Sequence, residues 1–124
     1  MLSINYKDPR PIYEQVRDAL RQLILSGAIA PGEKLPSVRE LAASVAINPN
    51  PIQRSYRELE KLGLVNTVAG KGAFAATDGT AALRWREELM ATLSSTLREL
   101  KLLGVSESEL QSMVLAAFRK EDET

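Results

Sequence analysis

Apolar residues in the first part of the chain recur at helical spacing, and turn residues separate them into short helices. A stripe of apolar positions predicts a first helix over residues 11–26, which Gly27 ends. Ser37 and Glu40 have the spacing of a capping box, so a second helix is predicted to begin there and to end by Ala46. Both helices have one apolar face and one polar face, as expected for helices that pack on a shared core.

A third helix follows almost at once. Asn48 is a favourable N-cap residue, Pro49 suits the first helical position, and Gly63 ends the segment. Its inner face is predicted to carry the apolar residues Ile52, Tyr56, Leu59 and Leu62. Only residues 46–47 separate the second and third helices, which is the short turn of a helix-turn-helix.

The next segment has the pattern of a β-hairpin. Residues 64–68 favour a strand, residues 69–72 are turn formers, and residues 73–76 return as a second strand. A very short strand is also predicted at residues 34–35. Helices, helix-turn-helix and hairpin in this order predict a winged helix-turn-helix domain over residues 1–76.

The remaining residues, 77–124, predict a linker over 77–80 and two helices over about 81–103 and 107–119. Ser106 and Glu109 form another capping box. Two helices have too little core to be stable alone, so their apolar residues are predicted to pack against a second copy of the chain. These residues are Leu89, Leu93, Leu97, Leu100, Leu110, Met113, Val114 and Phe118. The fold is therefore mostly α, an α+β winged domain followed by a two-helix dimerisation segment.

Composition narrows the possible functions. The 124 residues include no Cys and no His, which removes thiol nucleophiles, disulfides, the commonest metal ligands and the usual general base. No paired carboxylates or activated lysine stand in a recognisable motif, so we expect no enzyme, no cofactor and no metal. The start of the chain has no signal-peptide apolar core and no stretch is long enough to span a bilayer. We therefore expect a cytoplasmic protein without membrane attachment.

The net charge is zero, but the charge is unevenly distributed. Residues 1–76 hold ten Lys and Arg against seven acids, a balance of +3, and residues 77–124 hold six against nine, a balance of −3. This pattern indicates a basic module joined to an acidic one. The bias is modest and does not by itself identify a nucleic-acid binder.

The third helix carries a polar stripe outside its apolar face. Its members follow i, i+3, i+4, i+7 spacing and include no acid; they are Asn50, Gln53, Arg54 and Arg57. Amides pair with adenine edges in the major groove and arginine reads guanine or binds phosphate. The start of the helix is also expected to offer free amides to phosphate. The alternative is an ordinary solvated face, but the position after a short turn and before a hairpin favours DNA recognition.

Other residues near this stripe allow two interpretations. Arg39 lies on the first turn of the second helix, where it reaches DNA or forms a surface ion pair. Ser37 is more a helix cap than a DNA contact, although its amide could meet a phosphate. Gly70, Lys71 and Gly72 form an exposed tip that binds DNA as a wing or is only a soluble turn. They match neither a phosphate-binding loop nor a dinucleotide fingerprint.

At these residues the sequence resembles the GntR family of bacterial regulators. The resemblance rests on PIYEQV at 11–16, PGEKLPSVRELA at 31–42, NPN at 48–50, YRELE at 56–60 and GKGAF at 70–74. The NPN start and the short two-helix tail resemble the YtrA subfamily. The resemblance implies a homodimer that binds a palindromic double-stranded DNA operator, usually as a repressor and often of neighbouring transporter genes.

The family's DNA contacts carry over to matching positions, namely Arg39, Asn48, Asn50, Gln53, Arg54, Gly70, Lys71 and Gly72. Two positions depart from the pattern: Pro51 stands where the family usually has Thr, and Ala69 stands where Arg is common. Both remove polar contacts, which predicts a weaker grip on DNA or an altered sequence preference. They also motivate an alternative function, a winged-helix protein-interaction module that does not bind DNA.

A small-molecule effector is a further possible partner. Trp85, Met90 and Met113 could line its pocket, although packing within a dimer is the favoured interpretation. About 48 residues cannot enclose a large private cavity. An effector would therefore bind between copies or between domains and alter the spacing of the two winged domains.

Overall fold

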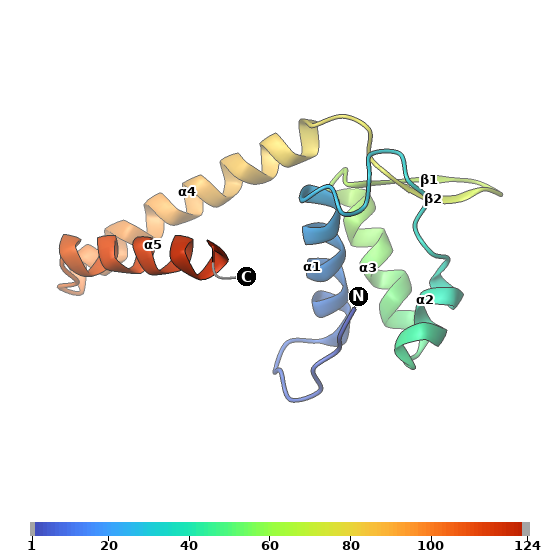
Figure 1. The fold of residues 1–124 in the computed structure, drawn as a ribbon, viewed down its shortest axis with the longest axis horizontal. Coiled ribbons are helices and arrows are strands. Elements are labelled where there is room, and N and C mark those ends of the chain that lie inside the picture. Colours follow the sequence, from blue (N-terminus) through green and yellow to red (C-terminus); the bar gives the residue numbers. More distant parts are fainter. Residues whose placement is uncertain (1, 123–124) are drawn as a thin grey trace. The chain divides into compact units, whose positions relative to one another are not determined.

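A computed structural model describes residues 2–122 of the chain. These residues divide into two compact units, one that extends to Arg84 and one that begins at Trp85, and each is described by itself. Figure 1 shows the elements, which are α1 (Ile12–Leu25), α2 (Val38–Val45), α3 (Pro49–Lys61), β1 (Val65–Val68), β2 (Gly72–Ala75), α4 (Thr80–Leu102) and α5 (Glu107–Asp122). Within residues 2–122 no helix combines the length and the apolar composition needed to cross a membrane.

The core of the first unit lies between α1, α2, α3 and the base of the hairpin. It is formed by apolar side chains from each of these elements, including Val16, Leu20, Leu41, Ala42, Ile52, Leu59, Val65 and Ala75. The inner face predicted for the third helix is confirmed, since Ile52, Tyr56 and Leu59 are buried and Leu62 packs against the core. The predicted winged-helix fold is therefore confirmed, and its core determines which face of α3 is exposed.

A buried serine joins α1 to α3, and the hydrophobic pattern did not predict it. Ser55 is fully buried, and its hydroxyl lies 2.7 Å from the carbonyl oxygen of Tyr13 and 2.9 Å from that of Pro51. A small side chain here lets the two helices approach closely, and its hydroxyl is satisfied by these carbonyls. This bond fixes the register of α3 against α1.

A second buried polar contact joins α3 to the segment before α2. Tyr56 donates its hydroxyl hydrogen to the carbonyl oxygen of Pro36 at 2.6 Å. Burial, with a smaller contribution from the negative charge of Glu40, raises the pKa of Tyr56 to about 12. The phenol is therefore held in its neutral, donating form, and it fixes the start of α2 relative to α3.

The turn between α2 and α3 is short and strained at one residue. Ala46 adopts a left-handed conformation with φ of 56°, a conformation that favours glycine, and the amide of Ile47 donates to Ala42 at 3.0 Å. At the other end of α2, the Ser37 hydroxyl accepts a hydrogen bond from the Glu40 amide at 3.1 Å, as the capping-box spacing predicted. These two ends define the helix-turn-helix.

The hairpin strands pair in antiparallel register from Val65 opposite Ala75 to Val68 opposite Gly72. The predicted strand at 34–35 is present as a single bridge between Lys34 and Phe74. The chain before α2 is therefore hydrogen-bonded along β2, and the hairpin is anchored at its base rather than projecting as an isolated ribbon.

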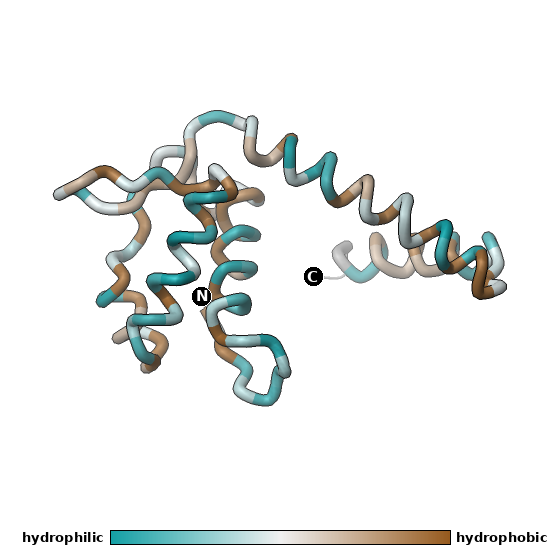
Figure 2. Tube along the Cα trace, turned by 180° about the vertical axis from the view of Figure 1, so that it is seen from behind, coloured by the Kyte–Doolittle hydropathy of each residue, from teal (hydrophilic) through white to brown (hydrophobic). Residues whose placement is uncertain are grey.

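In the second unit, α4 and α5 follow the predicted ranges closely, and the Ser106 hydroxyl caps α5 by accepting from the Glu109 amide at 3.1 Å. Apolar positions repeat along both helices (Figure 2). Six of the predicted dimer residues are exposed in the single chain, with Leu100 and Leu110 partly covered; the exposed ones are Leu89, Leu93, Leu97, Met113, Val114 and Phe118. The first turn of α4 belongs to the first unit, because Ala81 is buried in its core.

We predict that Tyr56→Phe lowers the free energy of unfolding at pH 7 by about 0.5–1.5 kcal/mol, because the Pro36 carbonyl loses its donor. The raised pKa of Tyr56 means that the folded state holds the phenolic proton more tightly. This contribution to stability is complete below about pH 10 and is lost as the pH rises toward 12. Denaturant unfolding from pH 7 to 11 should therefore show a smaller difference between native chain and variant at high pH. A difference that grows with pH would contradict this account.

Candidate nucleic-acid interface

The four residues of the predicted polar stripe lie on the solvent face of α3. Asn50, Gln53, Arg54 and Arg57 are all exposed, while the opposite face of the helix is buried. The spacing of these residues along the sequence therefore places them as predicted. No acidic residue interrupts this stripe, so α3 presents amide and guanidinium groups to solvent.

The residues of this stripe lie in two different environments. Gln53 and Arg57 line a groove of about 500 Å³ that lies between α3, the segment before α2 and the hairpin. Arg54 lies on the other edge of the helix, with its guanidinium carbon 3.6 Å from the centre of the Tyr13 ring on α1. Sequence spacing could not distinguish these two environments, because both partners are distant in sequence.

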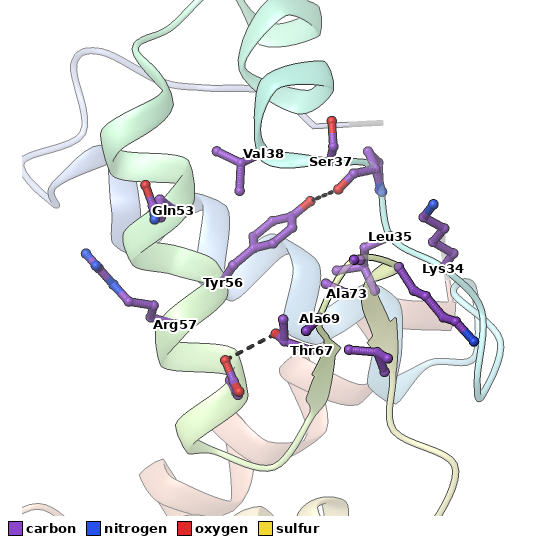
Figure 3. Close-up of a pocket in the computed structure, with 16 residues that line it drawn as sticks. Lys34, Leu35, Ser37, Val38, Gln53, Tyr56, Arg57, Thr67, Ala69 and Ala73 are labelled. Atoms are coloured by element: carbon purple, nitrogen blue, oxygen red, sulfur yellow. Dashed lines mark hydrogen bonds between the residues drawn. The ribbon is translucent and has the colours of Figure 1, made fainter.

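Figure 3 shows the groove, with Tyr56 extending from α3 toward the carbonyl of Pro36, and Ala69 on the hairpin side. Leu35 and Ala73 form part of its apolar lining. Its charged lining residues are the cations Lys34, Arg57 and Lys71 and the acid Glu60. Glu60 accepts a hydrogen bond from the Thr67 hydroxyl at 3.2 Å. Cations outnumber the acid, so the groove is expected to attract an anion.

Several ion pairs lie on another face of the first unit. Arg10, Arg17 and Arg21 pair with three acids at distances of 2.7–3.0 Å, and the acids are Asp8, Asp18 and Glu58. Although burial opposes it, the contacts of Arg17 with Glu58 and Asp18 raise the pKa of this guanidinium. The negative charge of Glu58, the acid of α3 that faces α1, is therefore neutralised by Arg17 of α1.

The cations beside the polar stripe differ from these paired arginines. Among the side chains of residues 2–120, Lys34, Arg39, Arg54, Arg57 and Lys71 form no ion pair within 4 Å. The surface ion pair considered for Arg39 is therefore absent from the described structure. A chain of zero net charge consequently presents a basic surface around α3 and the hairpin.

The first turn of α3 does not offer the free amides that the sequence analysis expected, and that expectation is wrong. Pro49 and Pro51 have no N–H, and the side-chain oxygen of Asn48 accepts from the Asn50 amide at 2.8 Å. At most the amide of Asn48 remains available. The same geometry explains why Pro51 is tolerated, since the position it occupies has no intrahelical hydrogen bond to lose. Asn48 keeps its NH2 group as a donor.

The hairpin tip consists of Gly70, Lys71 and Gly72, and Lys71 is exposed. Both glycines have positive φ, 75° and 119°, which other residues rarely adopt. A Cβ at Gly72 would lie 2.9 Å from the Cε atom of Lys34, whereas a Cβ at Gly70 would meet nothing within 4 Å. Lys34 therefore crosses the hairpin at Gly72.

Sequence analysis missed two residues of this surface. Lys34 lines the groove, and its position in the predicted short strand was the only signal that could have placed it beside the hairpin. Tyr13 contacts Arg54, and no local pattern indicates that contact. Ser37 lines the groove, but its hydroxyl is already engaged as the cap of α2.

Comparison with known proteins gives one consistent result. Residues 12–75 match the model of bacterial regulatory proteins of the gntR family. The HTH-type transcriptional repressor YtrA of Bacillus subtilis is 37% identical over 100 residues, which cover 81% of this chain and 75% of that protein. A GntR family transcriptional regulator from Listeria monocytogenes has 32% identity and a TM-score of 0.73, covering 88% of this chain and 96% of its own.

A solved complex with DNA is also similar. AraR(DBD) in complex with operator ORX1 is 29% identical, with a TM-score of 0.55, over 60% of this chain and 96% of its own. That likeness covers little more than half of the chain. Residues 12–75, which match the family model, account for a similar share.

We predict that Gly72→Ala destabilises the first unit more than Gly70→Ala. Gly70 has φ of 75°, close to the left-handed region that Ala reaches at a cost of about 1–2 kcal/mol, whereas φ of 119° at Gly72 lies outside that region and strains Ala further. A Cβ at position 72 also lies 2.9 Å from the flexible end of Lys34, which can move aside at little cost. Lys34→Ala should therefore leave the difference between the two glycine variants nearly unchanged. Denaturant unfolding of the single and double variants measures these differences. Equal losses for both glycine variants would contradict the greater backbone strain at Gly72.

Proposed function

This chain belongs to the GntR family of bacterial regulatory proteins, and we propose that it is a homodimeric repressor that binds an inverted-repeat operator. Members of this family are DNA-binding transcription regulators rather than enzymes. The observation that carries the proposal is the set of cations around the exposed polar stripe of α3 that form no ion pair with the described side chains.

In this proposal α3 enters the major groove of DNA. Asn50 and Gln53 pair with base edges and Arg54 reads a guanine, because these groups are exposed on one face of the helix. Arg39 and the Asn48 NH2 group contact the backbone at the edges of the groove. Pro51 lacks the hydroxyl that Thr offers at this position in other members of the family. Base preference at the start of α3 therefore differs from that of members with Thr.

The groove between α3 and the hairpin suits the DNA backbone. The backbone separates the major groove from the minor groove, so it must pass between a helix in one and a wing in the other. Arg57 and Lys71 line opposite sides of this groove and would contact phosphate from both sides. Gly70 and Gly72 let the tip approach DNA closely.

A second copy of the chain is the proposed partner of α4 and α5. Their exposed leucines would otherwise stay in water, and burial of each large apolar side chain contributes about 1.5–3 kcal/mol. We assign DNA binding to residues 1–76 and dimerisation to residues 77–124. A two-fold dimer requires an inverted repeat, with half-sites one or more helical turns apart.

We also propose a cytoplasmic location, because the proposed DNA partner lies in that compartment of a bacterial cell. A small-molecule effector stays a prediction. Trp85, Met90 and Met113 are candidate lining residues between the two copies, although packing within the dimer is their favoured role. The groove of the first unit is assigned to DNA in this proposal. An effector that changes the separation of the winged domains would mismatch the half-site spacing and release the operator.

We predict that Gln53→Ala relaxes base preference, whereas Lys71→Ala weakens binding to all sequences alike. Gln53 reads a base edge, so one base pair of each half-site should lose discrimination worth about 1–3 kcal/mol. Lys71 contacts phosphate, so the slope of log K against log salt should fall by about 0.9 for each lysine lost. Selection from random duplexes, followed by binding at several salt concentrations, measures both effects.

Lys61→Ala is the matched control, because Lys61 ends α3 outside the groove and should leave affinity and salt slope unchanged. If Gln53→Ala and Lys71→Ala alter all sequences equally, the assigned roles are wrong. If the native chain enriches no duplex at low salt, the proposed function itself fails, and a protein-interaction module becomes the better description.

We predict that Leu93→Glu produces a monomer, while Ala91→Glu leaves the dimer intact. Both residues are exposed on α4, but they lie about 160° apart around the helix axis, and only Leu93 belongs to the apolar stripe. The monomer should bind the operator at least roughly tenfold more weakly, because the two half-sites are no longer linked. Sedimentation equilibrium of both variants measures the mass. A dimeric Leu93→Glu variant would exclude this stripe as the interface.

A further inference from the structure

Arg54 rests on an aromatic ring rather than extending freely into solvent. Its guanidinium carbon lies 3.6 Å from the centre of the Tyr13 ring. This is the contact distance of two carbon atoms, so the planar guanidinium lies against the face of the ring. An edge-on guanidinium would hold its carbon farther away. The contact is a cation–π stack between α1 and the solvent face of α3.

Tyr13 is itself fixed to α3 at the neighbouring residue. Its carbonyl oxygen accepts from the fully buried Ser55 hydroxyl at 2.7 Å, while its ring contacts Arg54. Its own hydroxyl lies 3.3 Å from a side-chain oxygen of Glu14. Backbone and ring of Tyr13 thus contact two consecutive residues of α3, and the ring has a defined position against the helix.

Stacking leaves the hydrogen-bonding edge of Arg54 available. The five N–H donors of a guanidinium lie in its plane, so contact through its face occupies none of them. With the side chains of residues 2–120, Arg54 forms no ion pair, unlike the α1 arginine Arg17. The side chain is therefore fixed in direction while its donors and its charge remain unsatisfied by protein.

We propose that Tyr13 is a positioning residue that holds Arg54 in the orientation in which α3 presents it to a base edge. This inference rests on the proposed DNA binding by α3. Tyr13 acts through Arg54 and lies on α1, outside the helix-turn-helix. An arginine loses much rotamer freedom when it binds, and a stack that orders it beforehand removes part of that loss.

The proposal predicts a graded response at position 13. Tyr13→Leu removes the ring face and should weaken binding to the duplex selected by the native chain about threefold per half-site. A dimer contacts two half-sites, so the total loss is about tenfold. Tyr13→Phe keeps the ring and should bind within about twofold of the native chain. Tyr6→Leu removes an exposed tyrosine that precedes α1, whereas the ring stacked on Arg54 is that of Tyr13, and it should have no effect.

A double-mutant cycle separates positioning from general structural damage. Tyr13→Leu should cause no further loss of affinity when Arg54 is already Ala, because the side chain it positions is absent. In a background of Arg57→Ala, which alters the same helix face without a stacked partner, Tyr13→Leu should still cost about tenfold. Base discrimination at the pair read by Arg54 should fall in Tyr13→Leu and recover in Tyr13→Phe.

Equal losses in the native, Arg54→Ala and Arg57→Ala backgrounds would overturn the proposal, since Tyr13 would then act only through the fold. Tighter binding by Tyr13→Leu would also overturn it, because the stack would then withhold Arg54 from DNA. These outcomes are distinct from failure of the proposed function, in which the native chain itself selects no duplex. Thermal unfolding of each variant verifies that it is folded at the temperature of the binding measurement.

Discussion

The packing of α3 against α1 is the interaction on which the rest of the structure depends. Ile52 and Leu59 are fully buried in this contact region of the core, and Ser55 bonds across it to the Tyr13 carbonyl. Because these inner residues fix the rotation of α3 about its axis, they determine that the polar stripe is exposed. A different rotation would bury some of these amide and guanidinium groups.

This packing also explains how a protein without net charge presents a basic surface. Glu58 lies beside the inner face of α3 and is paired at 2.7 Å with Arg17 of α1. Asp8 of the N-terminal segment and Asp18 of α1 are also paired with neighbouring arginines, while the cations on the far side of α3 form no ion pairs among the described residues. Net charge is therefore a poor guide here, since the arrangement of ion pairs determines the local field.

Local sequence signals predicted most of the fold. Helical periodicity, the caps at Ser37, Asn48 and Ser106, and the hairpin turn each depend on residues a few positions apart, and the structure confirms them. The stripe on α3 was equally predictable, because helix geometry alone places its members on one face. The roles of these residues in DNA binding stay proposals.

What the sequence did not reveal depends on contacts between distant segments. Ser55 is a polar residue at a buried position, so hydrophobic patterning passes over it. The contacts of Tyr13 with Arg54 and of Lys34 with the hairpin join elements separated by dozens of residues. The lack of free amides in the first turn of α3 did not depend on distant contacts. Pro49 and Pro51 have no N–H, so the sequence already indicated it.

The central claim is that α3 contacts DNA through its exposed polar stripe and that the paired arginines of α1 do not. Nuclear magnetic resonance of the full chain, titrated with a duplex that it selects, tests this directly. We expect shifts in the side-chain signals of Asn50, Gln53 and Arg54, and unchanged signals for Arg17 and Arg21. Shifts confined to the α1 arginines, with the α3 signals unmoved, would contradict it.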